Sequence, residues 1–241
     1  MAMDLYKNPT KLEYYHDMWS LQCTATLLSH FKGDDGRHVL ILDRTIFHPQ
    51  GGGQPADTGF VLIHGLENKF LVSDVRSKDG IKGNEVSLFV DEHRRKLNSR
   101  LHSAGHLLDI CLPRIGLGHL EPGKAYHFSD GPWVEYKGTV PQNELQSKQK
   151  DLELEANALI SLGERISVHI LPYDEAAKIC GGSLPDYISK ESTPRIVRIG
   201  DNPGCPCGGT HVADISDIVQ IKVSQIRSKK GQTKVFYKVE S

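Results

Sequence analysis

Two widely separated pairs of metal-binding side chains place the strongest constraint on how this chain folds. His102 and His106 form one pair, Cys207 and His211 form the other, and three residues lie between the members of each pair. Three imidazoles and one thiolate make a donor set suited to zinc. Sulfur and imidazole nitrogen also favour zinc over magnesium or calcium. If all four side chains bind one ion, the fold must bring together two segments that lie far apart in the sequence.

The two pairs lie in segments of different local character. On an α-helix, residues four apart project from nearly the same face, so His102 and His106 can aim their ring nitrogens at one ion. Cys207 and His211 lie in a glycine-rich segment that can bend tightly around a metal. Cys205 is a second candidate thiol there. We favour Cys207, because its spacing to His211 matches that of the histidine pair.

Donor chemistry alone leaves the role of the site open. Four protein ligands would make a closed, structural site, whereas catalysis requires a position for water or substrate. The histidine pair by itself is also compatible with ordinary surface histidines. The second pair is what makes a metal site the preferred interpretation.

Length and composition are those of an ordinary soluble globular protein. The chain has 241 residues, of which 38% are hydrophobic and 24% charged, enough for one large domain or two modest ones. It contains no bilayer-spanning apolar run and no secretory signal, so we expect a cytoplasmic protein without membrane contact. The five scattered cysteines argue against a disulfide framework. A net charge of -1 excludes a globally basic nucleic-acid binder but not a local basic surface.

The spacing of apolar residues changes near residue 90. Before it, short β-branched segments predict a small barrel or sandwich; they cover residues 21–28, 38–43, 69–75 and 85–90. After it, apolar residues recur at intervals of three and four up to Cys111, which predicts a helix with Asp91 as its N-cap, ended by Pro113 and Gly116.

The rest of the chain mixes both kinds of element. We expect a second helix at residues 142–162, strands at 165–171 and 194–199, and a hairpin at 218–239. The predicted fold class is therefore α+β, with an N-terminal β domain of residues 1–90 and an α+β domain of residues 91–241. The sequence makes no prediction of oligomeric state.

A glycine-rich segment at residues 47–59 is the second unusual feature. Gly51, Gly52 and Gly53 are consecutive, and Gln54 and Asp57 follow them. Adjacent backbone N–H groups without side chains permit close approach of a ligand. The segment lacks the Gly-Lys-Ser/Thr ending of a P-loop. On chemistry alone, a tight loop between strands explains it equally well.

Taken together, these segments resemble one family. The histidine pair, the Cys207–His211 loop and the glycine segment occur in the order found in free-standing alanyl-tRNA editing proteins of the AlaX type, which are related to the editing domain of alanyl-tRNA synthetase. The resemblance spans most of the chain. Threonyl-tRNA synthetase editing domains share the two metal pairs but lack the glycine segment, so the alanyl branch is favoured.

The resemblance implies a small N-terminal β-barrel that carries the glycine motif, followed by an α+β editing domain. It implies one Zn²⁺ ion held by four ligands, namely His102, His106, Cys207 and His211. It also implies a trans-editing deacylase that removes serine, with glycine as a second candidate, from mischarged tRNA(Ala). The chain is too short to hold a synthetase body as well, so we expect editing of tRNA that has already been released.

The remaining site residues are assigned more loosely. We expect the glycine motif to position the substrate through Gly51, Gly52, Gly53, Gln54 and Asp57. No side chain stands out as a general base. His127 and Asp130 follow the first helix and could line the pocket, although a strand and its turn is the preferred interpretation for both. Zinc could activate a water or orient the substrate, and the sequence does not choose between them.

Two basic clusters are candidates for contact with the acceptor end of tRNA. They consist of Arg94, Arg95, Lys96 and Arg100, and of Lys229 and Lys230. Cations near the site would bind phosphates, but an ordinary solvated face explains any single residue as well. Two alternative functions stay open: a deacylase acting on Ser-tRNA(Thr), and a non-catalytic tRNA-binding module with structural zinc.

Overall fold

A computed structural model describes residues 9–63, 69–75 and 85–240 of the chain, which divide into two compact units. The first unit takes its described residues from Met1–Gln50 and Pro55–Arg95, and the second from Gly51–Gln54 and Lys96–Ser241. The change of unit falls within helix α1 (Glu92–Arg114). The predicted mixture of helices and several sheets is confirmed. The predicted division into domains of residues 1–90 and 91–241 stays a prediction.

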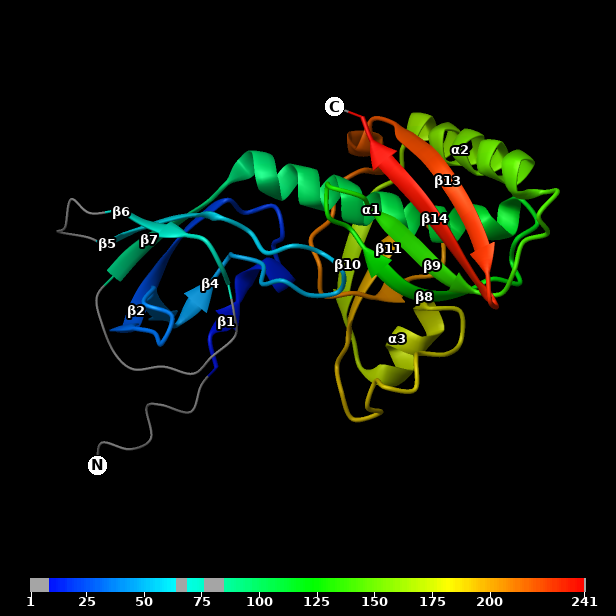
Figure 1. The fold of residues 1–241 in the computed structure, drawn as a ribbon. Helices are drawn as coiled ribbons and strands as arrows, with labels where there is room; N and C mark the ends of the chain where they lie inside the picture. The colour runs from blue at the N-terminus through cyan, green and yellow to red at the C-terminus, as the bar shows by residue number, and fades with distance from the viewer. Residues whose placement is uncertain (1–8, 64–68, 76–84, 241) are drawn as a thin grey trace. The chain divides into compact units, whose positions relative to one another are not determined.

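The first unit is built on an antiparallel sheet with the strand order β3-β2-β7-β5-β6 (Figure 1). Its strands are β2 (Gln22–Lys32), β3 (His38–Leu42), β5 (Gly59–Ile63), β6 (Lys69–Val72) and β7 (Glu85–Val90). Two short strands, β1 (Lys11–Leu12) and β4 (Arg44–Thr45), pair in parallel, and a 3-10 turn covers Glu13–Tyr15. No pairing joins β3 to β6 among the described strands, so the closed barrel stays a prediction.

Alternation of side chains explains how this sheet forms its core. Successive residues of a strand point to opposite faces, and in β7 the side chains of Val86, Leu88 and Val90 are buried, whereas the residues between them are less so. They pack with Ile46 and Phe47 in one apolar cluster. Burial in this strand therefore alternates with a period of two.

A buried ion pair lies at the C-terminal end of the first unit. Arg95 is 3% exposed and Asp57 is 0% exposed. The Arg95 Nη2 atom lies 2.5 Å from Asp57 Oδ2, and Arg95 also donates to the carbonyl oxygens of Met18 and Ile46. Asp57 Oδ2 accepts a further hydrogen bond, of 2.6 Å, from the His48 backbone N–H. Both charged groups therefore have their hydrogen-bonding partners within this unit.

The second unit combines two sheets with three helices. A four-stranded antiparallel sheet has the order β13-β14-β9-β8, and a three-stranded sheet has the order β10-β11-β12. The strands are β8 (Glu121–Tyr126), β9 (Trp133–Lys137), β10 (Ile166–Ile170), β11 (Arg195–Ile199), β12 (Cys205–Pro206), β13 (Ile221–Lys229) and β14 (Gln232–Val239). Besides α1, the helical elements are α2 (Leu145–Leu162), α3 (Tyr173–Ile179) and a 3-10 turn at Ile215–Ile218. No helix in the described parts of the chain has the length and apolar character to cross a membrane.

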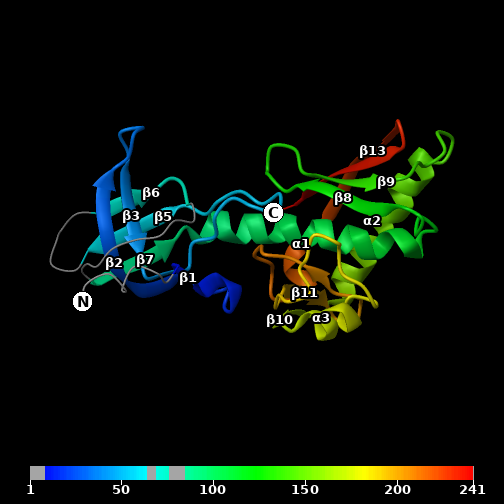
Figure 2. The same ribbon diagram turned by 90° about the horizontal axis from the view of Figure 1, so that it is seen from below.

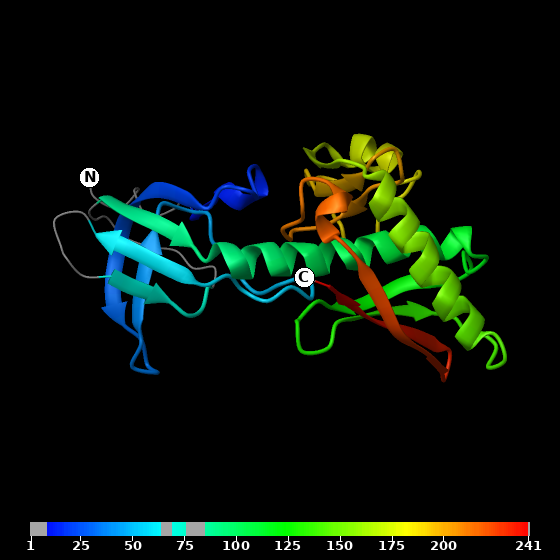
Figure 3. The same cartoon turned by 90° about the horizontal axis from the view of Figure 1, so that it is seen from above.

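Helix α1 supplies the centre of this second unit. Figures 2 and 3 show its C-terminal part between the four-stranded sheet on one side and the β10–β12 sheet with α3 on the other. Its apolar residues at intervals of three and four are buried, as the spacing predicted; they include Leu101, Ala104, Leu107, Leu108 and Cys111. The Asp91 carboxylate accepts a hydrogen bond of 3.0 Å from the Arg94 backbone N–H, which confirms the predicted N-cap.

Removing the buried carboxylate should destabilise the first unit. We expect Asp57→Asn to lower the free energy of unfolding by about 3–5 kcal/mol, because the Arg95 guanidinium would stay buried without its counter-charge. Arg37→Ala is the control. Arg37 pairs with Asp35 at 2.6 Å, but their side chains are 50% and 52% exposed, and exposed pairs contribute about 0–1 kcal/mol. Urea unfolding of both variants measures the difference; equal losses would contradict this account.

Candidate metal centre

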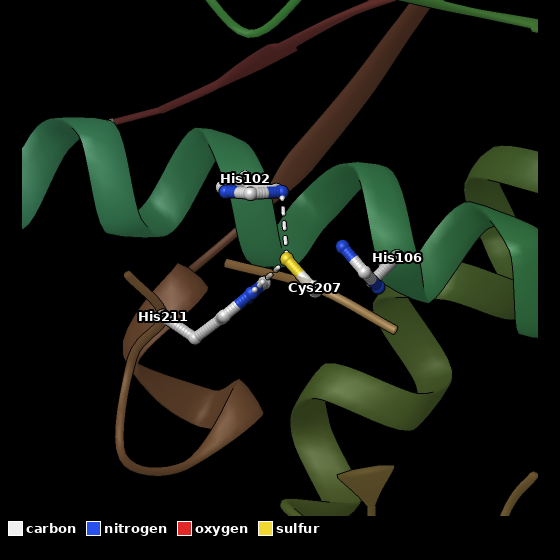
Figure 4. A group of neighbouring side chains, drawn as sticks. All are labelled: His102, His106, Cys207 and His211. Atoms are coloured by element: carbon white, nitrogen blue, oxygen red, sulfur yellow. Dashed lines mark hydrogen bonds between the residues drawn. The ribbon is translucent and has the colours of Figure 1, made fainter. Parts of the chain in front are cut away.

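The structure brings the two predicted pairs of donors together. The candidate ligand atoms of His102, His106, Cys207 and His211 all lie within 4.8 Å of one another (Figure 4). Cys207 Sγ is 3.5 Å from His102 Nε2 and 3.3 Å from His211 Nε2. Zinc bonds of ordinary length in a tetrahedral arrangement would separate such atoms by about 3.3–3.6 Å. The donor set therefore fits a metal ion of the zinc type, and so do the two separations from Cys207 Sγ.

Different elements position the two halves of this cluster. His102 and His106 lie one turn apart on α1, with ring centroids 5.0 Å apart. Cys207 and His211 lie in the loop after β12. The guanidinium of Arg195 on β11, itself 5% exposed, secures that loop by donating to the carbonyl oxygens of Cys207 and Gly209 at 2.6 and 3.0 Å.

A buried amide determines which nitrogen of His102 faces the cluster. Gln54 Oε1 accepts the Thr210 backbone N–H at 2.9 Å, and Gln54 Nε2 donates to Thr210 Oγ1 at 2.8 Å. The orientation of this amide is thus determined, because a backbone N–H can only donate. Gln54 Oε1 also lies 2.7 Å from His102 Nδ1. His102 must therefore carry its proton on Nδ1 and present the Nε2 lone pair to a metal.

The other two histidines have partners of the same kind. His211 Nδ1 lies 3.1 Å from Ser103 Oγ, and His106 Nδ1 lies 3.0 Å from Cys205 Sγ. Each contact occupies Nδ1 and orients the imidazole so that Nε2 remains for the metal. Cys205, which the sequence left as an alternative ligand, therefore contacts His106 instead of joining the four-donor group.

Burial shifts the pKa values of two of the donors, His106 and Cys207. It lowers the pKa of His106 to about 4, with a smaller contribution from the positive charge of Arg195, so this imidazole is neutral at physiological pH. Burial also raises the pKa of the Cys207 thiol, although the Gly209 N–H and Arg195 act in the opposite direction. A buried thiolate needs a positive charge beside it, and a bound metal would supply that charge.

Two glycines in the metal motifs give the imidazole rings their space. A Cβ atom on Gly209 would overlap the His102 ring and approach Gln54 Oε1. A Cβ atom on Gly105 would overlap the ring of His127, which stacks on His102 with a centroid separation of 4.5 Å. The small residue inside each pair is therefore a steric requirement of the ring packing.

The glycine segment contributes a tight turn to the second unit. Gly51 and Gln54 exchange two backbone hydrogen bonds, and the residues between them, Gly52 and Gly53, have φ values of 56° and 80°. Positive φ at both central residues is typical of a two-residue hairpin turn and favours glycine. The Gly53 carbonyl accepts the His127 N–H at 2.8 Å. The turn thus brings Gln54 to the cluster.

A cavity of about 510 Å³ opens beside the four-donor cluster. Three of the four donors, His102, His106 and Cys207, are among its lining residues. Of the predicted positioning residues, Gly52 and Gly53 line this cavity. Gln54 contacts the Nδ1 atom of His102, and Asp57 belongs to the first unit. The centre therefore borders a space large enough for a small ligand.

His127 also lines this cavity and is 3% exposed. Its Nδ1 lies 2.7 Å from the Tyr237 hydroxyl, which donates to the Leu101 carbonyl at 2.9 Å. The hydroxyl must therefore accept from Nδ1, and His127 Nε2 carries a lone pair. Burial, with the nearby His106, lowers the pKa of His127 to about 3. Asp130, in contrast, is exposed and accepts from the Tyr126 hydroxyl.

Asp109 is a cavity residue that the sequence interpretation missed. It lies on α1, three residues beyond His106, and accepts a hydrogen bond of 2.6 Å from the Tyr136 hydroxyl. Burial raises its pKa to about 6, although the Tyr136 hydrogen bond acts in the opposite direction. The signal was present in the sequence, because residues three, four and seven apart share one face of a helix.

The predicted basic contacts fall into different environments. Arg95 is buried against Asp57, so it offers no surface for tRNA. Arg100 donates to the carbonyl oxygens of Ile218 and Glu240, and burial lowers its pKa. The others are exposed: Arg94 and Lys96 on α1, and Lys229 and Lys230 at the β13–β14 turn.

Known proteins are similar to this chain over the segments that form this centre. The family described as "Threonyl and Alanyl tRNA synthetase second additional domain" matches residues 195–234, which include Cys207 and His211. The alanyl-tRNA editing protein AlaX-L of Pyrococcus horikoshii is 31% identical over 230 residues, covering 90% of this chain. Over most of its length, the chain is similar to this alanyl-tRNA editing protein.

Alanine–tRNA ligases form a second group of relatives. Those of Methanothrix thermoacetophila and Korarchaeum cryptofilum are 29% and 30% identical over 89% and 91% of this chain. The chain spans 54% of the length of AlaX-L and 24–25% of these two ligases. The predicted resemblance to the alanyl branch is confirmed.

Loss of the Gln54 amide should weaken metal binding. We expect Gln54→Ala to reduce zinc affinity about 10- to 100-fold, because His102 would lose the acceptor that orients its ring. Gln50→Ala is the matched control, since Gln50 is exposed. Competition titration with a chromogenic chelator measures the affinity, and equal affinities of the two variants would contradict this role for Gln54.

Adding one methyl group at Gly105 should disturb the ring stack. We expect Gly105→Ala to lower zinc affinity and thermal stability together, because the new Cβ displaces His127 and, through it, His102. Gly131→Ala is the control, because no heavy atom lies within 4 Å of the added Cβ there. Calorimetric melting with and without zinc measures both effects, and a zinc affinity unchanged by Gly105→Ala would refute the steric explanation.

Proposed function

We propose that this chain is a zinc-dependent aminoacyl-tRNA deacylase that hydrolyses mischarged tRNA(Ala), chiefly Ser-tRNA(Ala) and secondarily Gly-tRNA(Ala). The observation that carries the proposal is that three of the four donors line a cavity. Four protein ligands close the coordination shell of a zinc ion, so a water or the substrate would have to displace one ligand or join as a fifth, and the cavity gives it access to the ion. The name of the relative AlaX-L, an alanyl-tRNA editing protein, supports the same substrate class.

The donor set supports one Zn²⁺ ion held by His102, His106, Cys207 and His211. When bound, zinc supplies a Lewis acid that polarises an ester carbonyl or lowers the pKa of a water. Gln54, Ser103 and Cys205 keep the three imidazoles oriented through their Nδ1 atoms. These contacts would hold the centre rigid while the substrate binds and leaves.

His127 is the cavity residue suited to orient a hydrogen-bond donor. Its Nε2 lone pair is set by the Tyr237 hydroxyl, and its ring lies against His102. A water or hydroxyl held by this atom would lie beside the metal centre. The backbone at Gly52 and Gly53 borders the same space without side chains and leaves room for the terminal adenosine of tRNA.

The need for such an enzyme is physical. A synthetase pocket built for alanine cannot strongly reject serine, which adds one hydroxyl, or glycine, which lacks one methyl group. A separate hydrolytic site corrects the serine error if it recognises the hydroxyl group that alanine lacks. For the acceptor end of tRNA, we propose contacts by the exposed cations Arg94, Lys96, Lys229 and Lys230.

Ser-tRNA(Thr) is the second candidate substrate. The family matched at residues 195–234 takes its description from both threonyl- and alanyl-tRNA synthetases. The high coverage of the chain by alanyl relatives favours tRNA(Ala).

Release of serine from tRNA tests the function directly. We expect hydrolysis of Ser-tRNA(Ala) to be at least about 100-fold faster than that of Ala-tRNA(Ala) and of Ser-tRNA(Thr). Chelation of the metal, His102→Ala or Cys207→Ala should abolish hydrolysis. Cys23→Ala, a change in strand β2 of the first unit, should leave it intact. Time courses with ³H-serine on purified tRNA measure each rate.

Three results would contradict this proposal in different ways. Hydrolysis of Ser-tRNA(Thr) alone would mean that the substrate is the threonine tRNA and not tRNA(Ala). Tight tRNA binding with no hydrolysis by the zinc-loaded protein would support a binding module with structural zinc. Full activity of the metal-free protein would mean that zinc is not required for hydrolysis.

A further inference from the structure

Asp109 is the one carboxylate among the described residues that line the cavity. It lies on helix α1 one turn beyond His106 and two turns beyond His102, so all three side chains project from the same face of the helix. The carboxylate therefore lies on the same helix face as two of the donors and lines the same cavity. It is not one of the four donors of the cluster.

One oxygen of this carboxylate is held in place and the other is left for a ligand. The Tyr136 hydroxyl, on a side chain that is 1% exposed, donates to Asp109 Oδ1 at 2.6 Å. For Oδ2, the described residues provide no hydrogen bond and no ion pair. Lys124 lines the same cavity, but it forms no ion pair with Asp109 in the described structure.

A partly buried carboxylate with one oxygen that accepts no hydrogen bond is a favourable binding site for a cation. Removing a carboxylate from water is costly unless a hydrogen-bonding partner of opposite charge compensates. An aminoacyl ester brings such a cation, the α-ammonium group, which has three N–H donors and lies two bonds from the ester carbonyl carbon. Every amino acid that the proposed deacylase would remove carries this group.

We propose that Asp109 binds the α-ammonium group of the aminoacyl ester and thereby positions the ester carbonyl at the metal centre. This inference rests on the proposed deacylase function. Tyr136 fixes the carboxylate, and α1 fixes its distance from His106 and His102. Because serine, glycine and alanine share the ammonium group, Asp109 orients all three and does not discriminate among them. Discrimination belongs to other residues of the cavity.

Acetylation of the ammonium group tests the inference. Asp109→Asn should lower kcat/KM about 10- to 150-fold for both Ser-tRNA(Ala) and Gly-tRNA(Ala), the range expected for loss of a hydrogen bond to a charged group. The same substitution should change hydrolysis of N-acetyl-Ser-tRNA(Ala) by less than about twofold, because that substrate has no ammonium group. The asparagine Oδ1 still accepts from Tyr136, so zinc content and melting temperature should match the wild type.

Asp130→Asn is the matched control. Asp130 also accepts a hydrogen bond from a tyrosine, with 3.1 Å between Tyr126 Oη and its Oδ1, but it does not line the cavity. We expect Asp130→Asn to leave the hydrolysis rates of Ser-tRNA(Ala), Gly-tRNA(Ala) and N-acetyl-Ser-tRNA(Ala) unchanged. Tyr136→Phe should lower the same rates as Asp109→Asn, but by a smaller factor. The Asp109 carboxylate keeps its charge in this variant and loses only the hydrogen bond from the Tyr136 hydroxyl.

Two patterns would overturn the inference. Equal losses on Ser-tRNA(Ala) and N-acetyl-Ser-tRNA(Ala) would mean that Asp109 acts on water or on the fold instead of on the ammonium group. A loss with the seryl ester and none with the glycyl ester would mean that it binds the serine hydroxyl.

A binding measurement keeps this test separate from the proposed function. The probe is 3′-seryl-amino-3′-deoxyadenosine, a non-hydrolysable amide, compared with its N-acetyl form by calorimetry on the zinc-loaded protein. The wild type should prefer the free ammonium form, and Asp109→Asn should remove that preference. A wild type that shows no such preference refutes the inference even if deacylation is observed. A preference without deacylation refutes the proposed function alone.

Discussion

The buried side-chain amide of Gln54 is the contact on which the second unit depends. It connects the glycine turn with helix α1, through His102, and with the cysteine loop, through Thr210. A backbone N–H determines which end of the amide faces the histidine, so one ordinary hydrogen bond sets the tautomer of a candidate metal ligand. The glycine motif therefore serves the metal centre through the residue that follows it.

Close packing of imidazoles is the second condition of the site. His102 is enclosed by the His127 ring on one side and by the Gly209 backbone on another. Gly105 admits His127 to the same stack. A Cβ atom at either glycine would overlap a neighbouring imidazole ring, so that ring would have to shift. The spacing of the donors thus depends on residues that bind nothing themselves.

Charges that look alike in the sequence have different roles in the fold. Arg95 lies in a run of basic residues at the start of α1 and was a candidate for tRNA contact, yet it is buried against Asp57. Arg94 and Lys96 on either side of it are exposed. Helical geometry explains the difference, because neighbours in sequence point about 100° apart around the axis. Which of the three turns inward depends on where Asp57 lies.

The sequence by itself determined the donor set, the helix that carries two of its members, and the resemblance to alanyl-tRNA editing proteins. These follow from residue type, from the spacing of four on a helix and from the order of local motifs. Only the tertiary structure decided that Cys205 contacts His106 and stays outside the cluster, and that Gln54 supports His102. Each of these depends on contacts between residues far apart in the chain, and sequence spacing carries no information about which distant side chains meet.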